Sequence, residues 1–118
     1  MDEGLYMRDI REIAAIVAKW SAYALPPTED VLEITADMSQ WGETPLVTAR
    51  TAGGEVTLFD TTEASRANEV HLEDCRHVEA SWGDWQDEPG FAGLFCDALT
   101  AELTAKGLPA PHYILRDA

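Results

Sequence analysis

Carboxylates dominate the charge of this chain, and the imbalance limits how it can fold. Its 118 residues hold 22 Asp and Glu against 8 Lys and Arg, which gives a formal net charge of −14. Most carboxylates therefore have no cation to pair with, and because an unpaired buried charge is costly, they must lie on the surface. Such a surface repels nucleic acid and anionic membranes and attracts basic partners.

Two long stretches of the chain contain no Lys or Arg. Residues 21–49 hold five acids and residues 77–105 hold six, whereas three of the eight basic residues fall in the first predicted helix. If the charge is functional, we expect these two stretches to share one face of the molecule. If the charge serves solubility only, we expect the acids to be distributed uniformly over the surface.

Length and composition predict one globular domain over residues 1–118. A chain of this size can bury its own core, and four tryptophans argue against disorder. The apolar runs are too short to span a membrane, and the acidic start Met1–Gly4 is unlike the basic start of a signal peptide. We therefore expect a cytoplasmic protein in which Cys75 and Cys96 are reduced thiols.

The pattern of apolar residues in the first half predicts a helix followed by a meander of strands. Helical spacing predicts a helix over Tyr6–Ala24, and alternation predicts a strand over Val31–Met38. Two further strands, over 45–51 and 55–59, are expected to form a hairpin through Gly53-Gly54.

The second half is less regular. Residues 60–74 fit either a short helix or the start of a strand, and we favour a short helix followed by a strand over Arg76–Trp82. A loop over Gly83–Gly90, a helix over Phe91–Lys106 and an edge strand over 112–116 complete the prediction. The expected fold is α+β, a mainly antiparallel sheet of four to five strands packed by an N-terminal and a C-terminal helix.

No motif in the chain is specific for catalysis, a cofactor or a metal. His71 and Cys75 would share one face of a helix, as a thiolate–imidazole pair requires. In a strand, His71, Glu73, Cys75 and His77 would share one face, as a zinc site requires. A buried cysteine flanked by polar surface groups explains the same residues, and we therefore expect no enzyme activity, no cofactor and no metal.

Two of the four tryptophans lie in predicted loops bordered by acids, whereas Trp20 and Trp82 fall on faces predicted to be core. Aromatic side chains surrounded by charge have the composition of protein interface hot spots. The alternative is that each of these loop tryptophans folds back over the edge of the core. The candidate partner-binding residues are Trp41, Glu43, Asp84, Trp85, Asp87 and Glu88.

Residues 61–82, in which Ser65-Arg66 lead a predicted helix into a strand, are similar to the phosphate-binding segment of split-barrel flavin proteins. The similarity covers about a fifth of the chain. Ala67 stands where that family tends to place a second basic residue, and Glu69 and Glu73 would oppose a flavin phosphate. The resemblance implies, as an alternative function, a small-ligand or flavin-binding domain that uses this segment.

The sequence as a whole predicts an acidic module that occupies a basic site on a partner protein. Two kinds of protein fit: an immunity or antitoxin-like inhibitor of a cationic toxin, and a nucleic-acid mimic that blocks an enzyme of DNA or RNA. In both, carboxylates steer association and apolar anchors slow dissociation. The expected partner is a basic protein, without direct nucleic-acid or membrane binding, and the oligomeric state does not follow from the sequence.

Overall fold

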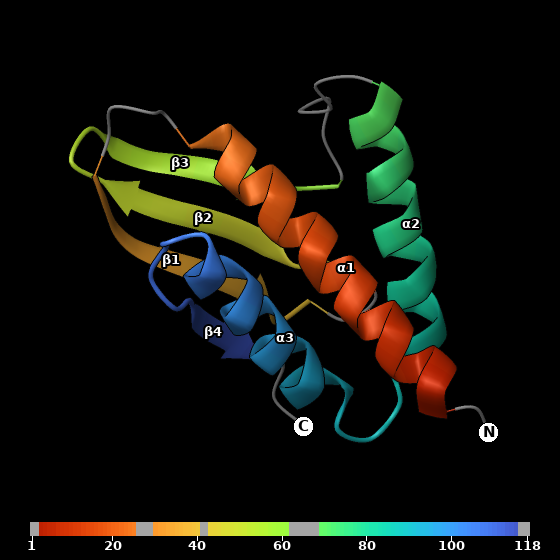
Figure 1. The fold of residues 1–118 in the computed structure, drawn as a ribbon. Coiled ribbons are helices and arrows are strands. Elements are labelled where there is room, and N and C mark those ends of the chain that lie inside the picture. The colour runs from red at the N-terminus through yellow and green to blue at the C-terminus, as the bar shows by residue number, and fades with distance from the viewer. Residues whose placement is uncertain (1–2, 26–29, 41–42, 62–68, 116–118) are drawn as a thin grey trace.

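The computed structural model of the chain describes residues 3–25, 30–40, 43–61 and 69–115. These residues form an α+β fold with three helices and a four-stranded sheet (Figure 1). In chain order the elements are α1 (Glu3–Ala24), β1 (Val31–Met38), β2 (Leu46–Thr51), β3 (Gly54–Phe59), α2 (Glu69–Trp85), α3 (Phe91–Ala105) and β4 (His112–Leu115). No helix in the described ranges is both long and apolar enough to cross a membrane.

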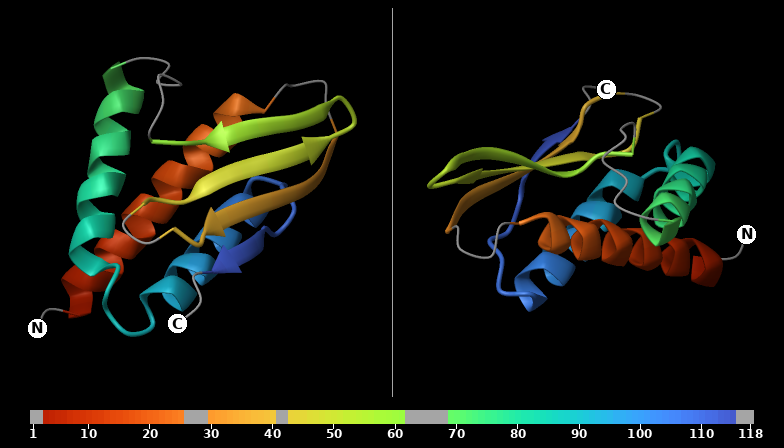
Figure 2. Two further views of the ribbon diagram at one scale, coloured as in Figure 1. Left: turned by 180° about the vertical axis from the view of Figure 1, so that it is seen from behind. Right: turned by 90° about the horizontal axis from the view of Figure 1, so that it is seen from above.

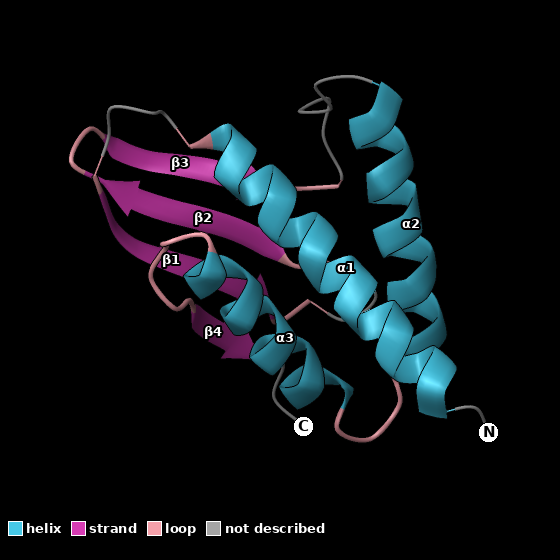
Figure 3. Cartoon of the chain, viewed as in Figure 1, coloured by secondary structure: helices cyan, strands magenta, loops and turns pink. Residues whose placement is uncertain are grey.

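The sheet has the strand order β3-β2-β1-β4. The neighbours β3, β2 and β1 pair antiparallel, but β4 pairs parallel to β1. The sheet is therefore mixed and not mainly antiparallel, which corrects the prediction. Figure 3 shows that the chain reaches β4 through helices and not through a tight turn. A hairpin enforces antiparallel pairing, whereas a helical crossover allows the next strand to enter parallel.

All three helices lie on one side of the sheet (Figure 2). Helix α1 contacts α2, α3 and β3, so it is the central element of the helical layer. Its apolar stripe is buried along its whole length and consists of Ile10, Ile13, Ala14, Val17 and Trp20. Helix α2 lies beside α1 and not over the strands (Figures 1 and 2).

Residues 69–85 form one continuous helix, so the strand predicted over 76–82 is wrong. The helix also includes the first residues of the predicted 83–90 loop, while most of the predicted short helix, 62–68, lies outside the described residues. Apolar burial in α2 recurs every three or four residues, as in any amphipathic helix. The side chains concerned are His71, Cys75, Val78 and Trp82. A strand would bury Val78, Ala80 and Trp82 on one face, but Ala80 is exposed.

Glycines mark both ends of α3. Gly90 precedes the helix with a φ of 82°, a left-handed conformation that turns the chain sharply between α2 and α3. At the other end the helix stops at Ala105, one residue before the predicted end, and Gly107 follows with a φ of 80°. The Gly107 N–H bonds the carbonyl oxygen of Thr104 (3.0 Å), which closes the last turn as the sequence predicts.

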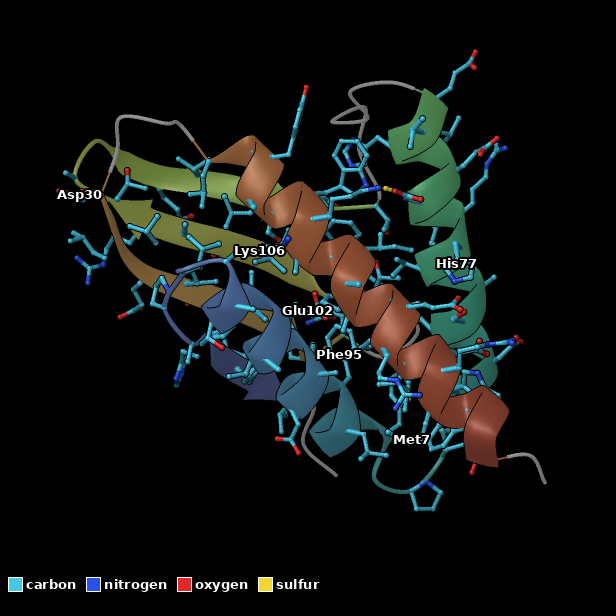
Figure 4. All side chains as sticks on the ribbon, viewed as in Figure 1. Met7, Asp30, His77, Phe95, Glu102 and Lys106 are labelled. Carbon is cyan, nitrogen blue, oxygen red and sulfur yellow. The ribbon has the colours of Figure 1, made fainter. Side chains whose placement is uncertain are left out.

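An aromatic cluster joins the end of α2 to the start of α3. The Trp82 ring lies edge-on to two phenylalanine rings, 4.8 Å from Phe91 and 5.0 Å from Phe95 between centroids. All three side chains are buried, and Figure 4 places Phe95 between α3 and α1. Edge-on aromatic pairs add specific attraction to the area they bury. The cluster therefore fixes how α2 and α3 meet.

We expect Phe95→Ala to lower the free energy of unfolding by about 3–5 kcal/mol, because it removes a fully buried ring and leaves a cavity. Leu46→Ala is the control, since Leu46 lies on β2 and is 39% exposed. The control should cost less than about 1 kcal/mol. Urea unfolding followed by tryptophan fluorescence measures both, and equal losses would contradict this description of the core.

Candidate functional site

A pocket of about 180 Å³ opens where the ends of β1 and β4 meet the turn between α2 and α3. Its lining residues are Met38, Gln40, Trp82, Gln86, Phe91, Ala92 and Leu115. The side chains of Met38, Trp82 and Phe91 are no more than 8% exposed, so they form an apolar floor continuous with the core. All lining residues except Leu115 belong to the two stretches without Lys or Arg, which therefore meet at this pocket.

Backbone hydrogen bonds hold the two segments that frame the pocket. In the turn after α2, the Gln86 N–H bonds the carbonyl oxygen of Trp82 (2.9 Å), and the Phe91 N–H bonds that of Glu88 (3.1 Å). After β1, the Glu43 N–H bonds the carbonyl oxygen of Gln40 (3.1 Å). Because the pocket residues sit in hydrogen-bonded turns at the ends of regular elements, the pocket is largely preformed.

Carboxylates flank the pocket residues in both segments. We call the following three side chains, each within three positions of a lining residue in the chain, the acidic rim: Glu43, Asp87 and Glu88. Asp37 alternates with Met38 along β1, so its carboxylate lies on the other face of the sheet. Ser39 donates two hydrogen bonds to Oδ1 of Asp37, one from its hydroxyl (2.6 Å) and one from its N–H (2.9 Å). These bonds lower the pKa of Asp37 below its ordinary value, so this carboxylate is ionised at neutral pH.

None of the candidate partner-binding residues that the structure describes lines the pocket itself, although their neighbours Gln40 and Gln86 do. Glu43 and Asp87 are exposed, Glu88 is half-buried, and Asp84 is exposed on α2. Trp41 lies outside the described residues. The two stretches without Lys or Arg thus meet at the pocket, and the carboxylates of the acidic rim follow its lining residues in the chain.

Trp85 ends α2 and packs against α1. Its indole N–H donates to Oδ2 of Asp9 (2.8 Å), and its ring lies 4.9 Å from that of Tyr6. Burial raises the pKa of Tyr6, and the nearby Glu88 carboxylate raises it further. Of the two arrangements considered for the loop tryptophans, Trp85 therefore adopts the one that folds back over the edge of the core. Its contacts with Asp9 and Tyr6 connect the α2–α3 turn to α1.

The apolar floor is the part of the site that sequence reasoning does not single out. Alternation assigns Met38 and Trp82 to the core, and Phe91 is predicted only as the first residue of a helix. Each of these residues lies at the end of its element, where a core side chain remains accessible from one side. The one sequence feature that could have identified Met38, Trp82 and Phe91 as pocket residues is their position next to the acidic turns.

Helix α2 places His71 and Cys75 on its buried face, as expected for a helix, and leaves Glu73 and His77 exposed. The Cys75 thiol is fully buried, and His71 is buried with its ring stacked on Trp20 (4.2 Å between centroids). His77 is exposed beside α1 (Figure 4), where its Nε2 lies 3.3 Å from Oε2 of Glu12. The shared strand face that a zinc site required does not exist, and no group of metal-ligating side chains occurs among the residues that the structure describes.

Cys96 does not offer a nucleophile either. The residue is half-buried in α3, and burial, together with the neighbouring Asp97 carboxylate, raises the pKa of its thiol to about 11. A thiol with this pKa stays protonated at neutral pH, whereas nucleophilic chemistry needs the thiolate.

A second, more open groove lies between α1 and α2, and its charges hold the two helices together. Its lining residues are Glu12, Ala15, Ile16, Glu73, Asp74 and His77. Oδ2 of Asp74 accepts hydrogen bonds from Nζ of Lys19 (2.6 Å) and Nε1 of Trp20 (2.8 Å). Burial raises the pKa of Asp74, but these bonds outweigh burial and hold the pKa below its ordinary value of 3.8.

The chain matches no protein-family model, no curated protein and no solved structure. What the site binds must therefore follow from its own shape and chemistry. A volume of 180 Å³ is close to the roughly 150 Å³ of an apolar cavity that holds benzene, and below the roughly 300–1,000 Å³ of common small-molecule pockets. The pocket is sized for one large apolar side chain.

We expect Asp74→Asn to lower the free energy of unfolding by about 1 kcal/mol at neutral pH, because partial exposure of the Lys19–Asp74 pair screens it. The pKa of Asp74 is lowered on folding, so its contribution is present above pH 3.8 and is lost as the pH falls below that value. The difference between wild type and variant should therefore shrink from about pH 6 to about pH 3.

Urea midpoints across this pH range measure the effect. Glu73→Gln is the control, because it removes one carboxylate from the neighbouring exposed position. A wild-type minus Asp74→Asn difference that stays constant with pH would contradict the role assigned to this carboxylate.

Proposed function

We propose that the chain is a non-enzymatic module that binds a basic site on a partner protein. The observation that carries the proposal is an apolar pocket at which the two stretches without Lys or Arg meet, with no Lys or Arg among the described residues that line it. The acidic rim belongs to the same two stretches. An apolar side chain of the partner enters the pocket, and Lys or Arg side chains around it pair with the rim. Anchors buried in pockets and ringed by polar groups dominate the energy of protein interfaces.

The division of roles follows from burial and charge. Trp82 and Phe91 supply the apolar contact and Glu43, Asp87 and Glu88 the charge, while Trp85 holds the turn in place through Asp9. Trp41 and Asp84 complete the candidate set, Trp41 from the segment after Gln40 and Asp84 from the exposed side of α2. The module acts as an immunity or antitoxin-like inhibitor, or as a nucleic-acid mimic, inside the cytoplasm.

The alternative is a small-ligand or flavin-binding domain that uses residues 61–82, of which Ser65, Arg66 and Ala67 lie outside the described residues. The resemblance requires a helix that leads into a strand, but residues 69–82 belong to one helix. The groove that includes Glu73, Asp74 and His77 from this segment has a volume of about 520 Å³, but three carboxylates line it, and these oppose a flavin phosphate. We therefore pursue the protein-binding function alone.

The test compares two double variants that each remove two negative charges. Asp87→Asn with Glu88→Gln changes the acidic rim, and Glu55→Gln with Glu69→Gln changes exposed acids on β3 and at the far end of α2. Immobilised wild type should retain a basic protein from a cell extract at about 50 mM salt and release most of it at about 200 mM.

The rim variant should bind that protein about tenfold more weakly, since each lost exposed ion pair is worth up to about 1 kcal/mol, and the control should bind it almost as well as wild type. Equal weakening by both double variants, or retention that ignores salt, would contradict a specific site. Competition by duplex DNA separates the two kinds of inhibitor, because only the target of a nucleic-acid mimic exchanges this module for DNA.

A further inference from the structure

Strand β4 is an edge strand that borders the pocket. It pairs with β1 on one side and, on the other, is the last strand of the sheet that the described residues form. Its last residue, Leu115, lines the pocket and is 49% exposed, and the neighbouring Ile114 is also exposed. An edge strand presents unpaired backbone N–H and C=O groups, which makes it a template for another strand.

The two edges of the sheet differ in how they are protected. At the β3 edge, the pairing of β3 with β2 has a register shift, which falls between the consecutive β2 residues Val47 and Thr48. In addition, Glu55 places a charge on β3. Bulges and charges are the usual devices that block edge pairing. Strand β4 contains His112, Tyr113, Ile114 and Leu115, without an Asp, Glu, Lys, Arg or Pro. The β4 edge is therefore the one suited to pairing.

Side-chain hydrogen bonds anchor β4 in place. The Tyr113 hydroxyl donates to the carbonyl oxygen of Cys96 (2.9 Å) and lies 2.9 Å from Oγ1 of Thr100, both on α3. Burial raises the pKa of Tyr113 to about 12, so the phenol keeps its proton at physiological pH. A strand held in this way loses little further entropy when it pairs.

Charge decides which kind of strand this edge accepts. A second copy of the chain would bring another net charge of −14 to the same surface. Asp37 pairs in register with Ile114, so a carboxylate lies one strand away from the open edge, and Asp87 and Glu88 directly follow Gln86, which lines the pocket. A cationic segment is therefore favoured over self-association.

We infer that β4 accepts an extended segment of the partner as a fifth strand. The segment alternates apolar and cationic side chains, because alternate residues of a strand point to opposite faces. Its apolar residues face the helical layer, where one enters the pocket beside Leu115, and its Lys or Arg residues face the side of Asp37. The inference rests on the proposed function and adds that backbone hydrogen bonds to β4 contribute to binding.

The probe is an acetylated and amidated peptide of about seven alternating lysine and leucine residues, long enough to span β4. In a strand, all leucine amides point to one edge and all lysine amides to the other. Two further peptides carry N-methyl groups either on every leucine amide or on every lysine amide. Calorimetric titration of the full chain at about 50 mM salt measures their affinities.

One N-methylated peptide should bind about tenfold more weakly than the parent, because it loses the hydrogen bonds to β4, and the other should bind like the parent. L115K should weaken the parent peptide about tenfold. L32K is the matched control and should not, since Leu32 is 54% exposed in β1 at the end away from the pocket. Far-ultraviolet circular dichroism shows that both variants remain folded.

Equal binding of both N-methylated peptides, or no binding of the parent, would overturn strand addition. If binding still weakens with Asp87→Asn and Glu88→Gln while N-methylation has no effect, the acidic rim and the proposed function stand and only strand addition fails. A dimer of the chain that L115K dissociates would also overturn the inference, because a second copy would then occupy the edge.

Discussion

The contact of Trp82 with Phe91 and Phe95 is the interaction on which the candidate site depends. Helix α2 lies beside α1 and not over the strands, so these rings are what join its end to α3 and thereby to the strand ends at the pocket. The same side chains that close the core form the pocket floor. The pocket therefore keeps its shape as long as the core is intact, and a partner that fills it does not have to order it first.

Local periodicity accounts for the parts of the fold that the sequence predicts well. The bounds of β1 are as predicted, and the hairpin forms where its glycines indicate. The strand predicted over residues 76–82 is wrong because Val78 and Trp82 fit a period of two as well as a helical spacing. In addition, His71 is polar by residue type, but it is buried against Trp20 and belongs to the apolar face of the helix. The parallel placement of β4 follows from packing between distant segments, which no local pattern encodes.

The candidate site could be predicted only in part, for a related reason. Composition indicates the acids at Glu43 and in the 84–88 segment, and their neighbours Gln40 and Gln86 line one pocket, whereas the acids themselves do not. The pocket itself draws on residues near 38–40, 82–92 and 115, which come together only through the sheet order and the α2–α3 turn. Whether Trp85 faces solvent or α1 depends on its bond to Asp9, 76 positions away in the chain, and this too is absent from any local pattern.

The net charge and the pocket act at different ranges. At physiological salt, exposed charges more than about 8–10 Å apart hardly interact, so most of the 22 carboxylates cannot pair with a partner docked at the pocket. Under the proposed function, acids such as Glu33 and Glu55 on the sheet, or Glu79 on α2, contribute to the approach of a basic protein. Under the same proposal, only carboxylates close to the pocket can distinguish one cationic partner from another. Specificity therefore depends on where these few charges lie relative to an apolar anchor, and not on the size of the total charge.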